Sequence, residues 1–224
     1  MTACVLLLRH GETDWNRLGR MQGRGDTPLT ARGLAQADAL ARAASRLGVR
    51  RVLASPLGRA RATAERVAAA AGCALELREA LAEMDFGECG GLTLDEVRER
   101  RPGLLEAREN DRWHHRWPGG ESYADVLERL TTGLDADMPL WTDPPTAIVA
   151  HQSVNRALLA GLTTSPHIAL SGTQPPNVLL RVDSEGGVWH TRLPEGPHGP
   201  RLVWWRGMFR RTGAPQGERR KKAA

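Results

Sequence analysis

The sequence has almost no lysine: Lys221 and Lys222, close to the C-terminal end, are the only two in 224 residues. The rest of the chain therefore has no lysine that could hold a nucleotide phosphate in a P-loop, form a Schiff base or act as a kinase lysine. A G-x-S-x-G nucleophile elbow is also absent from the sequence. These absences exclude several common classes of enzyme and leave arginine as the main cation.

Cysteine is scarce as well. Cys4, Cys73 and Cys89 are an odd number of widely spaced thiols without a C-x-x-C pair. This pattern is typical of reduced cysteines and not of a disulfide framework. None of the three is followed six residues later by an arginine, as the nucleophile of a cysteine-dependent phosphatase would be.

No hydrophobic run in the sequence is long enough to span a membrane. The apolar residues 5–8 near the N-terminus lack a positively charged leader and a small-residue cleavage site. We therefore expect a cytoplasmic protein that has no membrane partner.

The net charge of +5 comes from one end of the chain. Eight Lys/Arg residues and a single acidic residue lie from Arg201 onward, while residues 1–200 are slightly acidic. Residues 212–224 are rich in Gly, Pro and Gln, which is more typical of a solvated terminus than of an arm that binds nucleic acid. We expect residues 201–224 to form a basic, partly disordered tail, and we do not expect nucleic acid as a partner.

Short apolar runs alternate with amphipathic stretches along residues 1–200, which is the pattern of strands and helices in alternation. The predicted strands are residues 5–8, 52–54, 74–77 and 147–149, with a closing pair at 178–182 and 188–191. The predicted helices, caps included, are residues 30–48, 59–71, 94–101, 122–134 and 154–162. This order predicts an α/β fold: a single-domain, three-layer α/β/α sandwich with a mostly parallel central sheet.

Polar side chains follow the ends of four predicted strands. Arg9 and His10 follow the first, Arg59 lies just past the second, Glu83 follows the third and His151 follows the fourth. Because open α/β sheets bind ligands at the carboxyl ends of their strands, we expect these side chains to line one pocket. Two guanidinium groups, two imidazoles and one carboxyl suit the transfer of a phosphoryl dianion to a nitrogen nucleophile.

The motifs around these residues resemble those of the histidine phosphatase superfamily, also called the phosphoglycerate mutase-like family. The matching segments are RHGETDWN at 9–16, SPLGRARATA at 55–64, EMDFGECGGLTLDE at 83–96, PGGES at 118–122, AHQSVNRALLAGL at 150–162 and, more weakly, PPN at 175–177. The resemblance covers most of residues 4–182. It implies a phosphoglycerate mutase-like fold and a phosphatase domain over residues 1–200.

The resemblance also implies a role for individual residues. His10 would attack phosphorus and form a phosphohistidine, Glu83 would donate a proton to the leaving group, and His151 would be the second catalytic histidine. The residues that would bind the substrate are Arg9, Asn16, Gln22, Gly23, Arg59 and Gln152.

The implied partner is a small phosphorylated molecule. No metal ion and no cofactor is expected, because arginines supply the positive charge. The sequence leaves the oligomeric state open, a homodimer included.

Two departures from the family pattern leave the substrate open. Gln152 and Ser153 stand where much of the family has a glycine, which is similar to the fructose-2,6-bisphosphatase branch. Cys89 and Gly90 replace a tryptophan-glutamate pair that, in the family, often follows the acidic residue at the position of Glu83. We expect substrate specificity to depend on residues 17–26 and 91–120.

The short span of residues 92–118 favours a phosphatase over a cofactor-dependent mutase, which tends to have a longer insertion at this place. We therefore expect hydrolysis of small phosphomonoesters such as sugar phosphates or phosphoglycerates. The alternatives are phosphoglycerate mutase-type transfer, fructose-2,6-bisphosphatase-like activity, and binding of a phosphorylated ligand without turnover.

Overall fold

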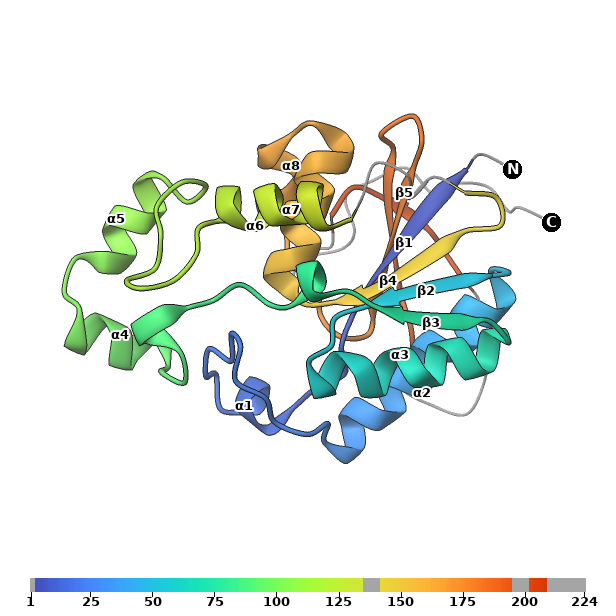
Figure 1. Cartoon of the computed structure of the whole chain (residues 1–224), viewed down its shortest axis with the longest axis horizontal. Coiled ribbons are helices and arrows are strands. Elements are labelled where there is room, and N and C mark those ends of the chain that lie inside the picture. The colour runs from blue at the N-terminus through green and yellow to red at the C-terminus, as the bar shows by residue number, and fades with distance from the viewer. Residues whose placement is uncertain (1–2, 135–141, 195–201, 209–224) are drawn as a thin grey trace.

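Strands and helices alternate along the chain, as the sequence predicts (Figure 1). The computed structural model describes residues 3–134, 142–194 and 202–208. The elements are β1 (Cys4–Arg9), α1 (Asp14–Arg17), α2 (Ala31–Arg46), β2 (Arg51–Ala54), α3 (Gly58–Ala71), β3 (Ala74–Leu77), the 3-10 helices η1 (Glu79–Leu81) and η2 (Gly87–Cys89), α4 (Leu94–Arg100), α5 (Leu104–Asn110), α6 (Tyr123–Gly133), β4 (Thr146–Ala150), α7 (Gln152–Thr163), α8 (Pro166–Leu170), β5 (Val178–Asp183), β6 (Val188–Arg192) and β7 (Trp205–Arg206). None of the helices in these ranges is long and apolar enough to cross a membrane.

The strands form one seven-stranded sheet in the order β3-β2-β4-β1-β5-β6-β7. The first four strands of the chain pair in parallel, whereas β5, β6 and β7 extend the sheet in antiparallel pairings. The predicted α/β sandwich is confirmed, with its parallel pairings confined to β1 through β4. This parallel half carries the strand ends at which we expect the site.

Alternate side chains of the central strands point into two separate cores. Leu7 and Ile148 pack with the side chains of α6 and α7, whereas Leu6, Leu8 and Val149 pack with those of α2 and α3. Figure 1 shows these helix pairs on opposite sides of the sheet. All five side chains are at most 1% exposed. Burial on both faces explains why the central strands read as uninterrupted apolar runs.

The ends of the predicted helices follow from local chemistry. Thr30 caps α2 by accepting a hydrogen bond from the backbone N–H of Gly33. Ser122 caps α6 in a capping box with Asp125. Helix α3 ends where Gly72 takes a left-handed conformation, with φ 64°.

Several short elements are absent from the sequence-based prediction. Helices α1, α5 and α8 have only four to seven residues, and α5 lacks a side-chain cap, whereas the equally short α4 begins with a capping box. Strand β7 adds Trp205 and Arg206, from the predicted basic tail, to the edge of the sheet beside β6. The predicted disorder at residues 212–224 lies outside the described residues, so the boundary at residue 200 stays a prediction.

The loop after β1 touches the first turn of α2 through two glycines. A Cβ atom on Gly11 would lie 2.2 Å from the carbonyl oxygen of Gly33, and one on Gly33 would lie 2.1 Å from the carbonyl oxygen of Glu12. The same Glu12 oxygen accepts a hydrogen bond of 2.9 Å from the backbone N–H of Thr30. Because the contacts are between backbone atoms, only glycine fits at both places. Helix α2 thereby fixes the backbone directly after His10.

We expect Gly33→Ala to lower the free energy of unfolding by about 1–3 kcal/mol, because the added methyl group must displace the backbone of Glu12. The control, Gly161→Ala, adds the same methyl group within α7, where it meets the flexible end of Leu127 at 2.9 Å. The control should change the free energy of unfolding by less than about 1 kcal/mol. Urea denaturation measures both variants, and equal losses would contradict the importance of the loop contact.

Candidate active site

The ends of the parallel strands bring the two predicted histidines and Arg59 together. The ring centroids of His10 and His151 are 5.1 Å apart, with an angle of 57° between the rings. Nε of Arg59 donates to Nε2 of His10 at 3.3 Å. The exposed fractions of His10, Arg59 and His151 are 2%, 1% and 0%. The predicted side chains therefore meet in a buried place at the carboxyl edge of the sheet.

The hydrogen bonds of His10 fix its tautomer. Nδ1 lies 2.7 Å from the carbonyl oxygen of Gly11, which can only accept, so Nδ1 bears the proton. The other ring nitrogen, Nε2, then has a free lone pair and accepts from Arg59. Burial, followed by the charges of Arg9 and Arg59, holds the pKa of His10 well below 6.5. At neutral pH His10 is therefore neutral, with an unprotonated nitrogen facing a guanidinium group.

Arg9 is anchored through one end of its guanidinium group. Its Nη1 donates to Oε1 of Gln152 at 2.9 Å and to the carbonyl oxygen of Gln174 at 3.1 Å. Its Nε is buried and has no hydrogen-bond partner among the described residues. Burial lowers the pKa of Arg9 to about 10, while the charge of Glu83 opposes this shift, so the group stays charged at neutral pH. The anchoring leaves the edge formed by Nε and Nη2 for a ligand.

Arg59 is anchored in the same way, by the loop of residues 22–27. Its Nη1 donates to the carbonyl oxygen of Gly25 at 2.6 Å and to Oδ1 of Asp26 at 3.2 Å. Its Nη2 donates to the carbonyl oxygen of Gly23 at 2.8 Å. Burial lowers the pKa of Arg59, and the charges of Glu83 and Asp26 oppose that change. The structure thus places the predicted residue Gly23 behind Arg59, where its carbonyl group orients the guanidinium.

Ser55 holds His151 from the end of β2. Nε2 of His151 lies 2.8 Å from Oγ of Ser55, and this hydroxyl oxygen accepts a hydrogen bond from the backbone N–H of Leu57 at 3.2 Å. Nδ1 of His151 is buried and unpartnered within the described part of the chain. Burial and then the charge of Arg59 hold the pKa of His151 well below 6.5. Ser55 is absent from the predicted site residues, although its place directly after a strand was a signal for it.

Glu83 is the carboxylate beside the cationic groups. Its side chain is 7% exposed, and one oxygen accepts from the backbone N–H of Met84 at 2.8 Å. Its charge acts on both Arg9 and Arg59, as its influence on their pKa values shows. In the described ranges, no three His, Cys, Asp or Glu side chains are grouped in a way that could hold a metal ion.

An ion pair between Arg129 of α6 and Glu121, which lies just before that helix, fastens the segment that contains Glu83. Nε of Arg129 donates to Glu121 at 2.8 Å, and its Nη2 donates to the carbonyl oxygen of Ala82 at 2.7 Å. The other carboxylate oxygen of Glu121 accepts from the backbone N–H of Asp85 at 2.8 Å. The backbone on both sides of Glu83 is therefore fixed by Arg129 and Glu121, neither of which is among the predicted site residues.

The predicted residues Asn16 and Gln22 take part in hydrogen bonds of their own loop. Oδ1 of Asn16 accepts from the backbone N–H of Thr13 at 3.2 Å. Nε2 of Gln22 donates to the Thr13 hydroxyl at 2.6 Å, and its Oε1 accepts from the Thr27 hydroxyl at 3.1 Å. These contacts brace the loop that contains the anchors of Arg59.

The two segments that we expect to set specificity are joined to each other. The backbone N–H of Met21 donates to the carbonyl oxygen of Leu92 at 2.9 Å, and that of Gly91 donates to the carbonyl oxygen of Met21 at 2.7 Å. Nη1 of Arg20 donates to the carbonyl oxygen of Gly91 at 2.6 Å. Residues 20–21 and 91–92 are thus linked by both backbone and side-chain hydrogen bonds.

Buried histidines and arginines at the parallel strand ends of an α/β sandwich are suited to binding a phosphoryl group. Comparison with known proteins identifies the family. The sequence profile of the histidine phosphatase superfamily (branch 1) matches residues 5–193. The chain therefore belongs to the histidine phosphatase superfamily.

Relatives of both kinds, mutase and phosphatase, resemble the chain. The probable phosphoglycerate mutase GpmB of Salmonella paratyphi B is 32% identical over 186 residues, which are 83% of this chain and 86% of the relative. The mycobacterial glucosyl-3-phosphoglycerate phosphatase complexed with VO3 has a TM-score of 0.72 at 31% identity, covering 83% of this chain and 91% of the other. The alpha-ribazole phosphatase of Shigella flexneri has a TM-score of 0.70 at 27% identity, covering 80% and 90%. Membership of the superfamily is thus established, while the reaction is not decided by it.

The buried imidazoles predict a stability that decreases in mild acid. His10 and His151 have pKa values well below 6.5 in the folded protein, and the unfolded chain titrates near 6.5. As the pH falls below about 6.5, the unfolded chain binds protons that the folded protein does not, so the free energy of unfolding decreases; above about pH 7 this contribution is constant.

His10→Gln removes one of these imidazoles. We expect the slope of unfolding free energy against pH to decrease by up to about 1.4 kcal/mol per pH unit between about pH 6.5 and pH 5. Urea denaturation over this range measures the slope, and the parallel curves expected above about pH 7 serve as an internal control. An unchanged slope in the variant would mean that His10 is already protonated in the folded protein.

Proposed function

We propose that this protein hydrolyses small phosphomonoesters through a phosphohistidine intermediate on His10. The observation that carries the proposal is the neutral imidazole of His10, whose Nε2 faces Arg59 and lies in the field of Arg9. An unprotonated nitrogen near two cations is suited to attack a phosphorus atom whose oxygens are held by those cations.

In the first step Nε2 of His10 forms a bond to phosphorus, and the bond from phosphorus to the ester oxygen breaks. The Nε and Nη2 edges of Arg9 and Arg59 bind the phosphoryl oxygens as forked donors. The hydroxyl of Ser55 donates to Nε2 of His151. The single N–H proton of the neutral His151 ring is then on Nδ1, which has no partner among the described residues. His151 then adds a neutral donor to the same phosphoryl group.

Glu83 handles the proton of the reaction. Glu83 takes up a proton from solvent when the ester binds, and in the first step its carboxyl group donates this proton to the leaving ester oxygen, which releases an alcohol. In the second step the Glu83 carboxylate takes a proton from the water that attacks the phosphohistidine. The nitrogen–phosphorus bond then breaks, which releases inorganic phosphate and restores neutral His10.

The other predicted residues orient these groups in the proposal. Gln152 holds Arg9 through its amide oxygen, and Gly23 holds Arg59 through its carbonyl oxygen. Asn16 and Gln22 brace the loop through Thr13 and have amide protons left to contact the substrate.

Two observations favour hydrolysis over transfer between substrate positions. The mycobacterial and Shigella structures that resemble the chain are named as phosphatases. The span of residues 92–118 holds two short helices, α4 and α5, of seven residues each. The Salmonella relative, named as a probable phosphoglycerate mutase, favours the alternative of a mutase-type transferase. Two assays with 3-phosphoglycerate distinguish a phosphatase from a mutase. One measures the release of inorganic phosphate, and the other measures conversion of 3-phosphoglycerate to 2-phosphoglycerate with and without a bisphosphate primer.

We expect His10→Ala to reduce phosphate release by at least about a thousandfold, because the nucleophile is lost. The measurement is a screen of phosphorylated metabolites in the presence of a metal chelator. Trapped wild-type enzyme should have its phosphoryl label on His10, bound by an acid-labile and alkali-stable linkage. The control is His114→Ala, because that side chain is 71% exposed. Activity retained by His10→Ala would refute the assignment of the nucleophile.

We expect the effect of Glu83→Gln to depend on the leaving group. With a sugar phosphate, whose alkoxide is a poor leaving group, kcat should fall by about 10²- to 10⁴-fold. With 4-nitrophenyl phosphate, whose leaving group needs little protonation, the loss should be at least about tenfold smaller. Steady-state kinetics with both esters measure the difference. Equal losses would show that Glu83 acts in some other way than as the proton donor.

A further inference from the structure

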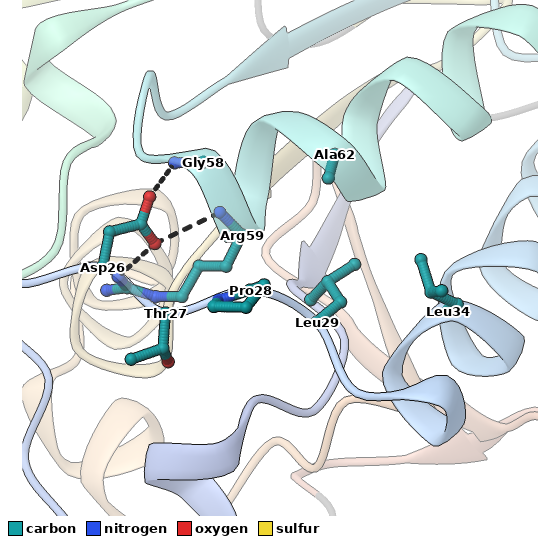
Figure 2. Close-up of a pocket in the computed structure, with 8 residues that line it drawn as sticks. All are labelled: Asp26, Thr27, Pro28, Leu29, Leu34, Gly58, Arg59 and Ala62. Atoms are coloured by element: carbon teal, nitrogen blue, oxygen red, sulfur yellow. Dashed lines mark hydrogen bonds and ion pairs between the residues drawn. The ribbon is translucent and has the colours of Figure 1, made fainter.

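Asp26, in the loop between α1 and α2, reaches the first turn of α3 (Figure 2). Its Oδ2 accepts from the backbone N–H of Gly58 at 2.5 Å, and its Oδ1 accepts from that of Arg59 at 3.3 Å. Leu57, the residue at the N-cap of α3, offers no side-chain hydrogen bond to the helix. Asp26 thus supplies from a distant part of the sequence the cap that the local sequence lacks.

The same carboxylate also holds the far end of the Arg59 side chain. Oδ1 of Asp26 accepts from Nη1 of Arg59 at 3.2 Å. Figure 2 shows the carboxylate bridging the helix backbone and the guanidinium group. One carboxylate therefore fixes both the backbone from which Arg59 projects and the group that enters the site.

The contacts of Arg59 leave one edge of its guanidinium group directed into the site. The guanidinium group has five N–H donors. The two on Nη1 are directed to Gly25 and Asp26, and one on Nη2 is directed to Gly23. The remaining edge, formed by Nε and the second proton of Nη2, includes the Nε–H that donates to His10.

The contact leaves no room for a side chain at the start of α3. A Cβ atom on Gly58 would lie 2.4 Å from Oδ2 of Asp26. Beside the carboxylate, which is 38% exposed, there is a cavity of about 470 Å³. Its walls include Pro28, Leu29 and Ala62 (Figure 2). A small carboxylate ion can reach the position of the Asp26 side chain through this cavity.

We propose that Asp26 is a positioning residue, which fixes Arg59 so that its free edge and Nε2 of His10 bind the same phosphoryl group. The proposal rests on the proposed function, because it takes Arg59 as a ligand of that group. A displacement of about 1 Å in a group that binds the transition state is sufficient to reduce a rate by about a hundredfold. Asp26 touches neither His10 nor the substrate in this scheme and acts through Arg59.

The test is chemical rescue of Asp26→Ala. We expect kcat for a phosphomonoester to fall by about ten- to a hundredfold, because Arg59 loses its anchor. Sodium formate should restore at least about a third of the lost activity in a saturable way, whereas sodium chloride at equal ionic strength should not. Wild-type enzyme in formate corrects for inhibition at the phosphate site. The control is Asp38→Ala, which removes a similar pair of 2.9 Å, between Asp38 and Arg66, on the exposed faces of α2 and α3.

Asp26→Asn is the second variant, should the alanine protein fail to fold. It keeps an oxygen for Gly58 but loses the charge that faces Arg59, so kcat should fall by about three- to tenfold without rescue by formate. An Asp26→Ala enzyme as active as the Asp38→Ala control would overturn the proposal, as would a folded Asp26→Ala enzyme that formate does not rescue. Unchanged kcat in Asp26→Asn would overturn it in the same way.

Binding of orthovanadate separates this proposal from the proposed function. If wild-type protein hydrolyses no ester, the proposed function fails, and the dissociation constant for vanadate still tests Asp26. We expect that constant to rise by about tenfold in Asp26→Ala and to recover in formate, since Arg59 then binds the anion less well. Equal vanadate binding by the two proteins would overturn the role of Asp26.

Discussion

The structure depends on keeping two imidazoles neutral while two guanidinium groups stay charged next to them. Burial and the charges of Arg9 and Arg59 both disfavour a proton on His10, so the two guanidinium groups help to keep its Nε2 lone pair unprotonated. Nε of Arg9 and Nδ1 of His151 are buried without partners in the described ranges. Each such atom costs about 1–3 kcal/mol, which a phosphoryl oxygen can recover. The unpartnered donors of the site are therefore matched to an anion.

Backbone carbonyl groups do most of the orienting in this site. The oxygens of Gly11, Gly23 and Gly25 fix His10 and Arg59, and the oxygen of Gln174 fixes Arg9. A carbonyl oxygen can only accept a hydrogen bond and has no rotamer of its own, so it fixes the direction of an N–H group more firmly than a surface side chain does. The loop backbone thus decides which edge of each guanidinium group faces the histidines.

The sequence reveals those parts of the site that have a local pattern. His10 and His151 each follow a buried apolar run, so the general rule for sheets is enough to bring them together. Asp26 and Gln174 have no such pattern, because their contacts with Arg59 and Arg9 join residues 33 and 165 positions apart. Helix α5 is as short as the predicted helix α4, but it lacks the capping box that marks the start of α4. The sequence therefore predicts the strands that bring the site residues together. It does not predict the long-range contacts that orient their side chains.

The position of β1 in the sheet has a consequence for folding during translation. This strand lies between β4 and β5, and its residue Val5 pairs with Thr146 and Val182, which are made long after it. Pairings so distant along the chain close slowly, because a long loop must first be ordered. The strand that leads to His10 therefore stays without either neighbour until the chain has been translated through β4, and without its second neighbour until β5 has followed. During that interval its apolar residues need the protection that the cell gives to unfinished chains.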